Sequence, residues 1–159
     1  MTIKIESRES IEERAGVPFP AHTALISIAD ADADFIVLKN NPEYLLQLKF
    51  DDINADILEE IIKSHPAIKE AMQAAKMLHW FSDEQAEETA AFIMSAADKA
   101  ELIICQCEYG QLRSAGIAAA IMQFFSNDGI EIFADERYYP NKLVYKKVLA
   151  ALQGSANNS

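Results

Sequence analysis

The sequence has little cysteine, no long apolar run and no segment typical of a secretion signal. It holds two cysteines in 159 residues, which excludes a framework stapled by several disulfides. No segment reaches the roughly 18 consecutive apolar residues of a transmembrane helix. The opening residues MTIKIE lack the apolar core and cleavage site of a signal peptide. We therefore expect a globular, cytoplasmic protein that does not enter a membrane.

Positive charge is also scarce. Lysine and arginine number 14 against 25 aspartates and glutamates, and the net charge is −11. No basic cluster offsets this excess, so we expect neither nucleic acid nor an anionic membrane as a partner. Arginine occurs only as Arg8, Arg14, Arg113 and Arg137. A site that grips an anion through a guanidinium group thus depends on one of these.

The residue types that bind metals form no ligand pattern. The three histidines share no ligand spacing; they are His22, His65 and His79. Three aspartates alternate with alanine after an apolar stretch, at Asp30, Asp32 and Asp34. The glycine and the final glutamate of a calcium-binding loop are missing there. We interpret the aspartates as a solvated loop, and we expect no metal and no cofactor.

Hydrophobic periodicity predicts one α/β domain. Short apolar stretches predict strands at residues 2–5, 23–29, 44–50 and 102–106. Apolar periodicity predicts helices at residues 10–15, 55–63, 67–78, 82–97 and 142–152, the first with Ser7 as its N-cap. Residues 114–125 are apolar nearly all round, which predicts a helix buried in the domain. This alternation favours a central, mostly parallel sheet of about four to five strands flanked by helices. The domain is expected to span residues 1–152, with a flexible polar tail at 153–159.

The most informative stretch is LIICQCEYGQLRSAGI at residues 102–117. An apolar strand leads to Cys107, and five residues later Arg113 and Ser114 open an apolar helix. Backbone N–H groups of such a loop can point into one concavity, to which the positive end of the helix dipole adds. Cys-x5-Arg-Ser between a strand and a helix therefore predicts a phosphate-binding loop that carries a nucleophile.

The residue types of this loop suit the binding and attack of a phosphate group. Arg113 can hold two phosphate oxygens with its planar guanidinium group. Cys107 would lie in the same positive field, which favours the nucleophilic thiolate. The predicted phosphate-binding residues are consecutive: Glu108, Tyr109, Gly110, Gln111, Leu112 and Arg113. The alternative is a structural cysteine, because free cysteine is often buried in strands.

A pair of acids follows another predicted strand. Asp51 and Asp52 come directly after residues 44–50, and ligands in α/β proteins bind at the carboxyl ends of strands. Acidic residues in this position are also common as exposed loop residues and as N-caps of the next helix. The residues alone leave both interpretations open.

At the Cys-x5-Arg-Ser motif the chain resembles the cysteine-dependent protein tyrosine phosphatases, in their small, dual-specificity-like form. The stretch LKFDD at residues 48–52 looks like that family's strand leading to the general-acid loop. The helix at 82–97 looks like the one before the nucleophile strand. The sequence YPN at 139–141 is similar to predicted phosphatases of bacteria and phages, in which Pro-Asn precedes the last helix. The two helices at about 54–78 then form an insertion.

The resemblance implies a dual-specificity-phosphatase-like fold and hydrolysis of a phosphate monoester through a phosphocysteine. Cys107 would attack phosphorus while Arg113 and the loop amides hold the phosphoryl oxygens. Asp52, with Asp51 as the backup, would protonate the leaving oxygen and then activate water. Ser114 would donate a hydrogen bond to the sulfur. The expected partner is a phosphorylated protein, above all phosphotyrosine, or a small phosphoester.

Departures from the family pattern keep two further hypotheses open. Gln106 stands where the family usually has histidine, and Glu108 brings a carboxylate into the loop. A phosphatase-like module that binds phosphorylated partners with weak or no hydrolysis is therefore the second hypothesis. The third is a thiol-based arsenate or sulfur-transfer enzyme with Cys105 as the resolving thiol. We expect Cys105 and Cys107 on opposite faces of their strand.

Overall fold

The computed structural model describes residues 1–14, 16–65 and 67–157, so Ala15, Pro66, Asn158 and Ser159 lie outside the described residues. The strands are β1 (Thr2–Ser7), β2 (Thr23–Ala29), β3 (Tyr44–Lys49) and β4 (Leu102–Cys107). The helices are α1 (Arg8–Glu13), α2 (Ala55–Ser64), α3 (Ile68–Met77), α4 (Asp83–Ala97), α5 (Arg113–Ser126), α6 (Ile130–Ala134) and α7 (Lys142–Asn157). Ser7 is the N-cap of the first helix, as its sequence predicts, and its side chain accepts a hydrogen bond from the N–H of Ser10.

The strands form one parallel sheet in the order β1-β4-β2-β3. β2 is buried along its whole length, which fits its mostly apolar sequence and a strand covered on both faces. Because the strands run in one direction, the segments that follow their carboxyl ends meet at one edge of the sheet. The predicted single α/β domain with a parallel sheet and flanking helices is confirmed.

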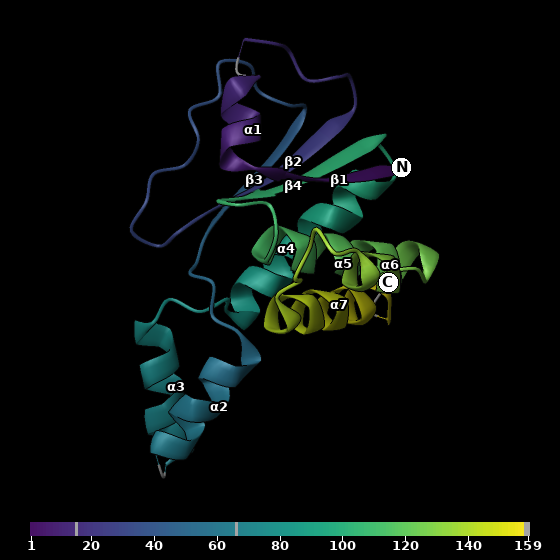
Figure 1. Ribbon diagram of the computed structural model, residues 1–159. Helices are drawn as coiled ribbons and strands as arrows, with labels where there is room; N and C mark the ends of the chain where they lie inside the picture. The colour runs from purple at the N-terminus through teal and green to yellow at the C-terminus, as the bar shows by residue number, and fades with distance from the viewer. Residues whose placement is uncertain (15, 66, 158–159) are drawn as a thin grey trace.

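Helices cover both faces of the sheet (Figure 1). α4, α5 and α7 lie on one face, and α1 lies on the other. The larger core fills the space under α4, α5 and α7, and it includes Ile26, Phe50, Ile93, Ile117 and Val148. The smaller core lies under α1 and consists of Ile11, Leu25, Ile36 and Ile104. These two cores hold β2 and β4 rigidly, and with them the segments that follow each strand.

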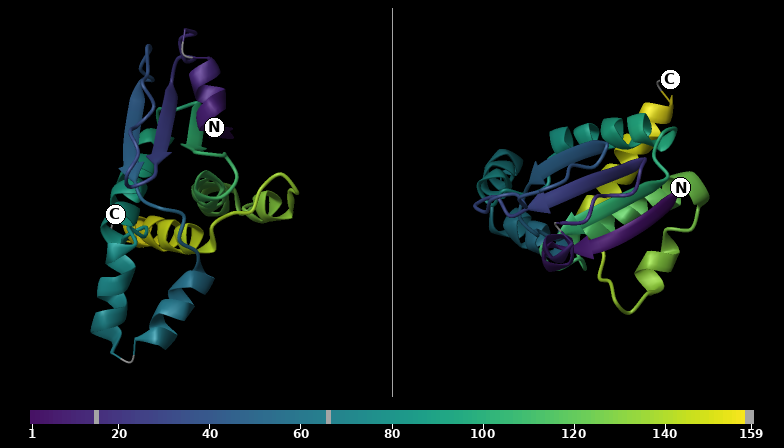
Figure 2. Two further views of the ribbon diagram at one scale, coloured as in Figure 1. Left: turned by 60° about the vertical axis from the view of Figure 1, so that its left-hand side comes forward. Right: turned by 90° about the horizontal axis from the view of Figure 1, so that it is seen from above.

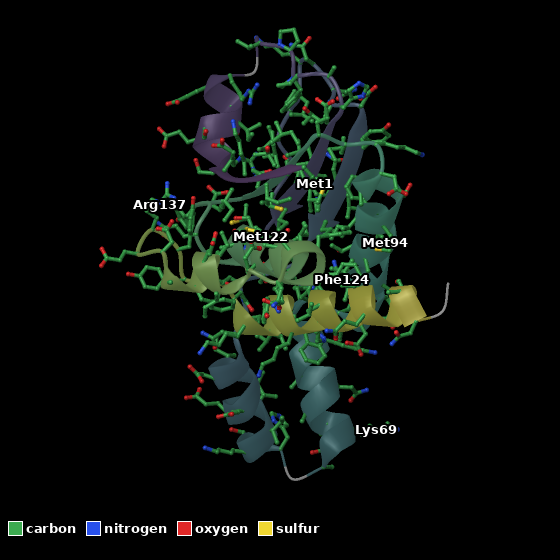
Figure 3. The ribbon with its side chains drawn as sticks, turned by 90° about the vertical axis from the view of Figure 1, so that its right-hand side faces the viewer. Met1, Lys69, Met94, Met122, Phe124 and Arg137 are labelled. Atoms are coloured by element: carbon green, nitrogen blue, oxygen red, sulfur yellow. The ribbon has the colours of Figure 1, made fainter. Side chains whose placement is uncertain are left out.

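α2 and α3 form a hairpin that projects from the body of the molecule (Figures 1 and 2). Figure 3 shows Lys69 of α3 far from Met94 of α4 and Phe124 of α5, which lie in the body. Within the described residues, α2 and α3 pack mainly against each other. The two helices predicted at about 54–78 are therefore present, and they are attached at the loop that follows β3.

Helix ends bear out one sequence prediction and correct another. α4 opens with the predicted capping box, in which Ser82 and Gln85 bind each other's backbone N–H groups. α7 continues through Asn157, so the predicted tail is helical at residues 153–157. A helix already formed gains one hydrogen bond for each residue it adds, which allows polar residues to prolong it. No helix in the described part of the chain has the length and apolar character needed to cross a membrane.

Candidate active site

The predicted phosphate loop lies at the carboxyl edge of the sheet. β4 ends at Cys107 and α5 begins at Arg113, and both side chains are buried, at 2% and 5% exposed. No side chain caps the amino terminus of α5 at Leu112. The N–H groups of its first turn are thus left for a ligand, at the positive end of the helix dipole.

The backbone of the loop is oriented by its neighbours. Three loop carbonyls accept hydrogen bonds from outside the loop: Glu108 from Arg8 at 3.1 Å, Gln111 from Tyr139 at 2.9 Å and Leu112 from Asn141 at 2.9 Å. In the part of the chain that the structure describes, the N–H groups of residues 109–112 donate to no protein acceptor. An anion-binding concavity needs backbone N–H groups that are free to face the anion. The loop has this arrangement, because its carbonyls bind groups outside the loop and these N–H groups meet no acceptor among the described residues.

Gly110 allows the loop to pack closely against the end of β1. Its φ of +65° lies in the left-handed region, which glycine adopts without strain. A Cβ atom at this position would lie 2.8 Å from the carbonyl carbon of Glu6 and 2.8 Å from the nitrogen of Ser7. Both the turn and the contact therefore require glycine.

Cys107 and Ser114 are in contact beneath the loop. The Cys107 Sγ lies 3.0 Å from the Ser114 Oγ, and both residues are buried. A hydroxyl at this distance can donate to a thiolate and stabilise its charge. The nucleophile that the sequence predicted therefore has a hydrogen-bond donor next to it.

Arg113 is held by one of its terminal nitrogens. Nη1 donates to the carbonyl of Phe50 at 2.7 Å and lies 2.7 Å from a carboxylate oxygen of Asp30. Among the described residues, no protein acceptor binds its Nε or Nη2. With Nη1 held, the edge of the guanidinium group formed by Nε and Nη2 can bind two oxygens of an anion.

Asp30 is the site residue that the sequence analysis missed. We had interpreted Asp30, Asp32 and Asp34 together as a solvated loop, and Asp30 instead pairs with the buried Arg113. Its position directly after the buried strand β2 was the available signal, because such positions face the ligand edge of a parallel sheet.

The two candidate acids differ in their surroundings. An oxygen of the Asp51 carboxylate accepts from the N–H of Ala31 at 3.0 Å, so it ties the loop after β3 to the loop after β2. Asp52 is exposed and accepts from the side-chain amide of Asn141 at 2.7 Å. Asp52 also lines a surface hollow of about 250 Å³ that Leu112 of the phosphate loop lines as well.

The residues that depart from the family pattern have partners outside the loop. Gln106 is 1% exposed, and its Oε1 accepts from the hydroxyl of Ser27 at 2.5 Å while its Nε2 lies 3.5 Å from the carbonyl of Ile28. It therefore links β4 to β2. Glu108 contributes to a separate hollow beside α1 that Arg8 and Glu12 also line.

The expected orientation of Cys105 is wrong. Cys105 and Cys107 belong to the same core cluster, because side chains in a strand alternate with a period of two and residues i and i+2 share a face. Cys105 is fully buried, and burial, followed by the nearby Cys107, raises the pKa of its thiol. A neutral, inaccessible thiol is poorly suited to resolve an intermediate.

A metal centre finds no support in the geometry. Across the described residues, no group of three or more histidine, cysteine, aspartate or glutamate side chains is arranged to hold a metal ion. The groups gathered at the edge of the sheet are Cys107, Ser114, Arg113, nearby carboxylates and backbone amides.

Comparison with known proteins identifies the fold. No protein-family model and no curated protein sequence match the chain. The crystal structure of human DUSP28, a dual-specificity phosphatase, is 15% identical with a TM-score of 0.53, over 99% of this chain and 95% of that one. A structure of PTPMT1 in complex with PI(5)P is 12% identical with a TM-score of 0.48, over 99% and 95% of the two chains. The likeness to DUSP28 shows that this chain has a dual-specificity-phosphatase-like fold, as the resemblance implied.

Proposed function

We propose that the protein is a cysteine-dependent phosphatase that hydrolyses a phosphate monoester, with protein phosphotyrosine as the expected substrate. One observation carries the proposal: the Cys107 Sγ lies 3.0 Å from the Ser114 Oγ, beneath a loop whose carbonyls are bound outward. This contact supports the proposal, because a thiol with its own hydrogen-bond donor lies next to backbone amides that are free to bind an anion.

In the first step, the Cys107 thiolate attacks phosphorus and forms an S–P bond as the P–O bond to the leaving group breaks. Arg113 and the loop amides hold the phosphoryl oxygens, whose charge they stabilise in the transition state. Asp52 gives its proton to the leaving oxygen, so that an alcohol departs.

In the second step, water attacks the phosphocysteine. The Asp52 carboxylate takes a proton from the water, the new P–O bond forms, and the S–P bond breaks to release inorganic phosphate. Ser114 donates a hydrogen bond to the departing thiolate. The enzyme returns to its starting state with Asp52 protonated. Because the nucleophile must stay reduced, the proposal places the protein in a reducing compartment such as the cytoplasm.

Turnover of para-nitrophenyl phosphate between about pH 5 and 8 tests this function. We expect hydrolysis by the wild type and none above background by Cys107→Ser. Cys105→Ala is the matched control, because it removes a thiol of the same strand face and is expected to keep turnover. A wild type that shows no turnover anywhere in this range contradicts the proposal.

A binding module is the second candidate, and Gln106 favours it. The family's histidine would add positive charge beside the nucleophile, whereas Gln106 is neutral and is held by Ser27 and Ile28 of β2. This candidate predicts that the wild type binds a phosphotyrosine peptide in calorimetry without hydrolysing it. Arg113→Ala is expected to abolish that binding, since it removes the guanidinium edge.

A further inference from the structure

Asn141 joins the parts of the candidate active site. It is 4% exposed, and its backbone N–H donates to the carbonyl of Leu112 in the phosphate loop at 2.9 Å. Its side-chain Nδ2 donates to the Oδ1 of Asp52 at 2.7 Å and to the carbonyl of Ile53 at 3.1 Å. A single residue therefore binds both the loop that would hold the phosphate and the segment that carries the candidate acid.

The orientation of this amide is determined by its surroundings. The Oδ1 of Asn141 accepts from the N–H of Val144 at 3.0 Å and caps α7. With the oxygen fixed on that donor, both hydrogens of Nδ2 point to Asp52 and Ile53, which are acceptors. Exchanging the nitrogen and the oxygen would set an oxygen against the Asp52 carboxylate, so the network permits one arrangement.

The backbone of Asn141 is equally constrained. A Cβ atom on Gly116, in the first turn of α5, would lie 2.7 Å from the carbonyl oxygen of Asn141. α5 therefore packs directly against this residue just after the phosphate loop. The distance between the loop and Asn141 is fixed by packing as well as by the hydrogen bond to Leu112.

The contact with Asp52 also distinguishes its two oxygens. Oδ1 accepts from an N–H, and an oxygen that accepts this bond cannot point its own proton at the same hydrogen. The proton of the acid form therefore belongs on Oδ2. Asp52, Asn141 and Leu112 of the phosphate loop line the same surface hollow.

We propose that Asn141 is a positioning residue: it fixes the Asp52 carboxyl group at a set distance from the phosphate loop and keeps the transferable proton on Oδ2. This inference rests on the proposed phosphatase function. It explains how Asp52 keeps a defined place although its loop leads directly into the projecting hairpin of α2 and α3. Asn141 touches no reacting atom, and it acts through Asp52.

Two esters with different leaving groups test the inference. Phenyl phosphate releases a weakly acidic phenol that needs protonation, whereas para-nitrophenolate leaves without it. Asn141→Asp keeps an oxygen to cap α7 but removes both donors. We expect this variant to lose about 10²-fold or more in kcat on phenyl phosphate, the scale of a general-acid contribution. Its kcat on para-nitrophenyl phosphate should fall far less, and its KM for both esters should stay close to that of the wild type.

Ser82→Asp is the matched control. Ser82 also caps a helix through its side-chain oxygen, which accepts from the N–H of Gln85, but it lies outside the hollow that Asp52 and Asn141 line. This variant likewise places an aspartate at a helix cap and should keep wild-type rates on both esters. The reciprocal double variant Asp52→Asn/Asn141→Asp can re-form the hydrogen bond with donor and acceptor exchanged. It should recover thermal stability but not the turnover of phenyl phosphate.

The outcomes separate the inference from the function on which it rests. If the wild type hydrolyses both esters and Asn141→Asp loses kcat on both in equal proportion, Asn141 is structural and the inference is wrong. Unchanged rates in Asn141→Asp also overturn it. If the wild type hydrolyses neither ester, the proposed function fails and the inference falls with it. Orthovanadate binding by Asn141→Asp checks the phosphate loop, because the bond to Leu112 uses only the backbone.

Discussion

The carboxylate of Asp30 lies 2.7 Å from the Nη1 of Arg113. The loop after β2 thus supplies a counter-charge to the arginine of the phosphate loop, which β4 and α5 position. The Asp30 side chain is 43% exposed, whereas that of Arg113 is 6% exposed. The pair is therefore partly screened by water, and its main effect is to hold the guanidinium group in one orientation.

Replacing Asp30 with alanine should destabilise the free protein. Among the described residues, the Phe50 carbonyl would be the one hydrogen-bond acceptor left to the buried Arg113. A loss of about 1–2 kcal/mol is expected for a partly exposed pair. Thermal melting measures this loss. Added orthovanadate should raise the melting temperature of the variant more than that of the wild type, because the anion replaces the missing charge. Asp32→Ala, at an exposed aspartate of the same loop, should change neither value; an equal effect there would contradict the assignment.

Gly110→Ala should weaken anion binding. The added methyl group would meet the backbone of Glu6 and Ser7 at 2.8 Å, and a left-handed φ is strained for alanine. The loop must then shift, so orthovanadate affinity should fall by tenfold or more, which is about 1.4 kcal/mol. Gly154→Ala is the control, because nothing lies within 4 Å of its added Cβ. If Gly110→Ala binds orthovanadate as the wild type does, the close packing of the loop does not set its affinity.

Ser27 and Gln106 should show strong coupling in a double-mutant cycle. Ser27→Ala leaves the buried Oε1 of Gln106 without its donor, which is expected to cost about 1–3 kcal/mol of unfolding free energy. Gln106→Leu removes the polar group itself, so adding Ser27→Ala to it should cost much less. Urea denaturation of the four proteins measures the coupling. Additive losses would mean that the hydrogen bond contributes little.

Ser114→Ala should slow the second chemical step more than the first. In the proposed mechanism, the hydroxyl 3.0 Å from the Cys107 Sγ stabilises the thiolate as it leaves phosphorus, so its loss should let the phosphocysteine accumulate. Rapid mixing with para-nitrophenyl phosphate should then show a burst of para-nitrophenolate followed by a slower steady rate. Ser126→Ala, at the far end of α5, should show the wild-type time course. A slow rate without a burst would place the role of Ser114 before the intermediate.

The buried Cys105 should make the protein less stable in alkali. Burial raises its pKa in the folded state above the ordinary value of 9.0, so above this pH the unfolded chain releases a proton that the folded chain keeps. The contribution of Cys105 is thus fully present below about pH 9 and is lost as the pH rises, at about 1.4 kcal/mol per pH unit. Urea denaturation of the wild type and Cys105→Ala at several pH values measures the difference. Parallel pH dependences would show that Cys105 titrates alike in both states.

Most of the fold was predictable because its signals are local. Each signal lies within one short segment of sequence: the mostly apolar β2, the capping box at Ser82 and the apolar surface of α5. The prediction that Cys105 and Cys107 lie on opposite faces of their strand was wrong. Side chains in a strand alternate with a period of two, so residues two apart share a face. The end of α7 was missed because helix propagation carries a helix past its last apolar residue.

The sequence by itself determined that Cys107, Arg113 and Ser114 lie together between a strand and a helix, since they fall within eight consecutive residues whose backbone path follows from a strand, a glycine turn and a helix. Only the tertiary structure decided which partners surround that loop. Asp30 and Asn141 come from segments distant in the chain, and they reach the site because parallel strands end at one edge and α7 packs against α5. Such contacts depend on how the elements pack together, which local periodicity does not encode.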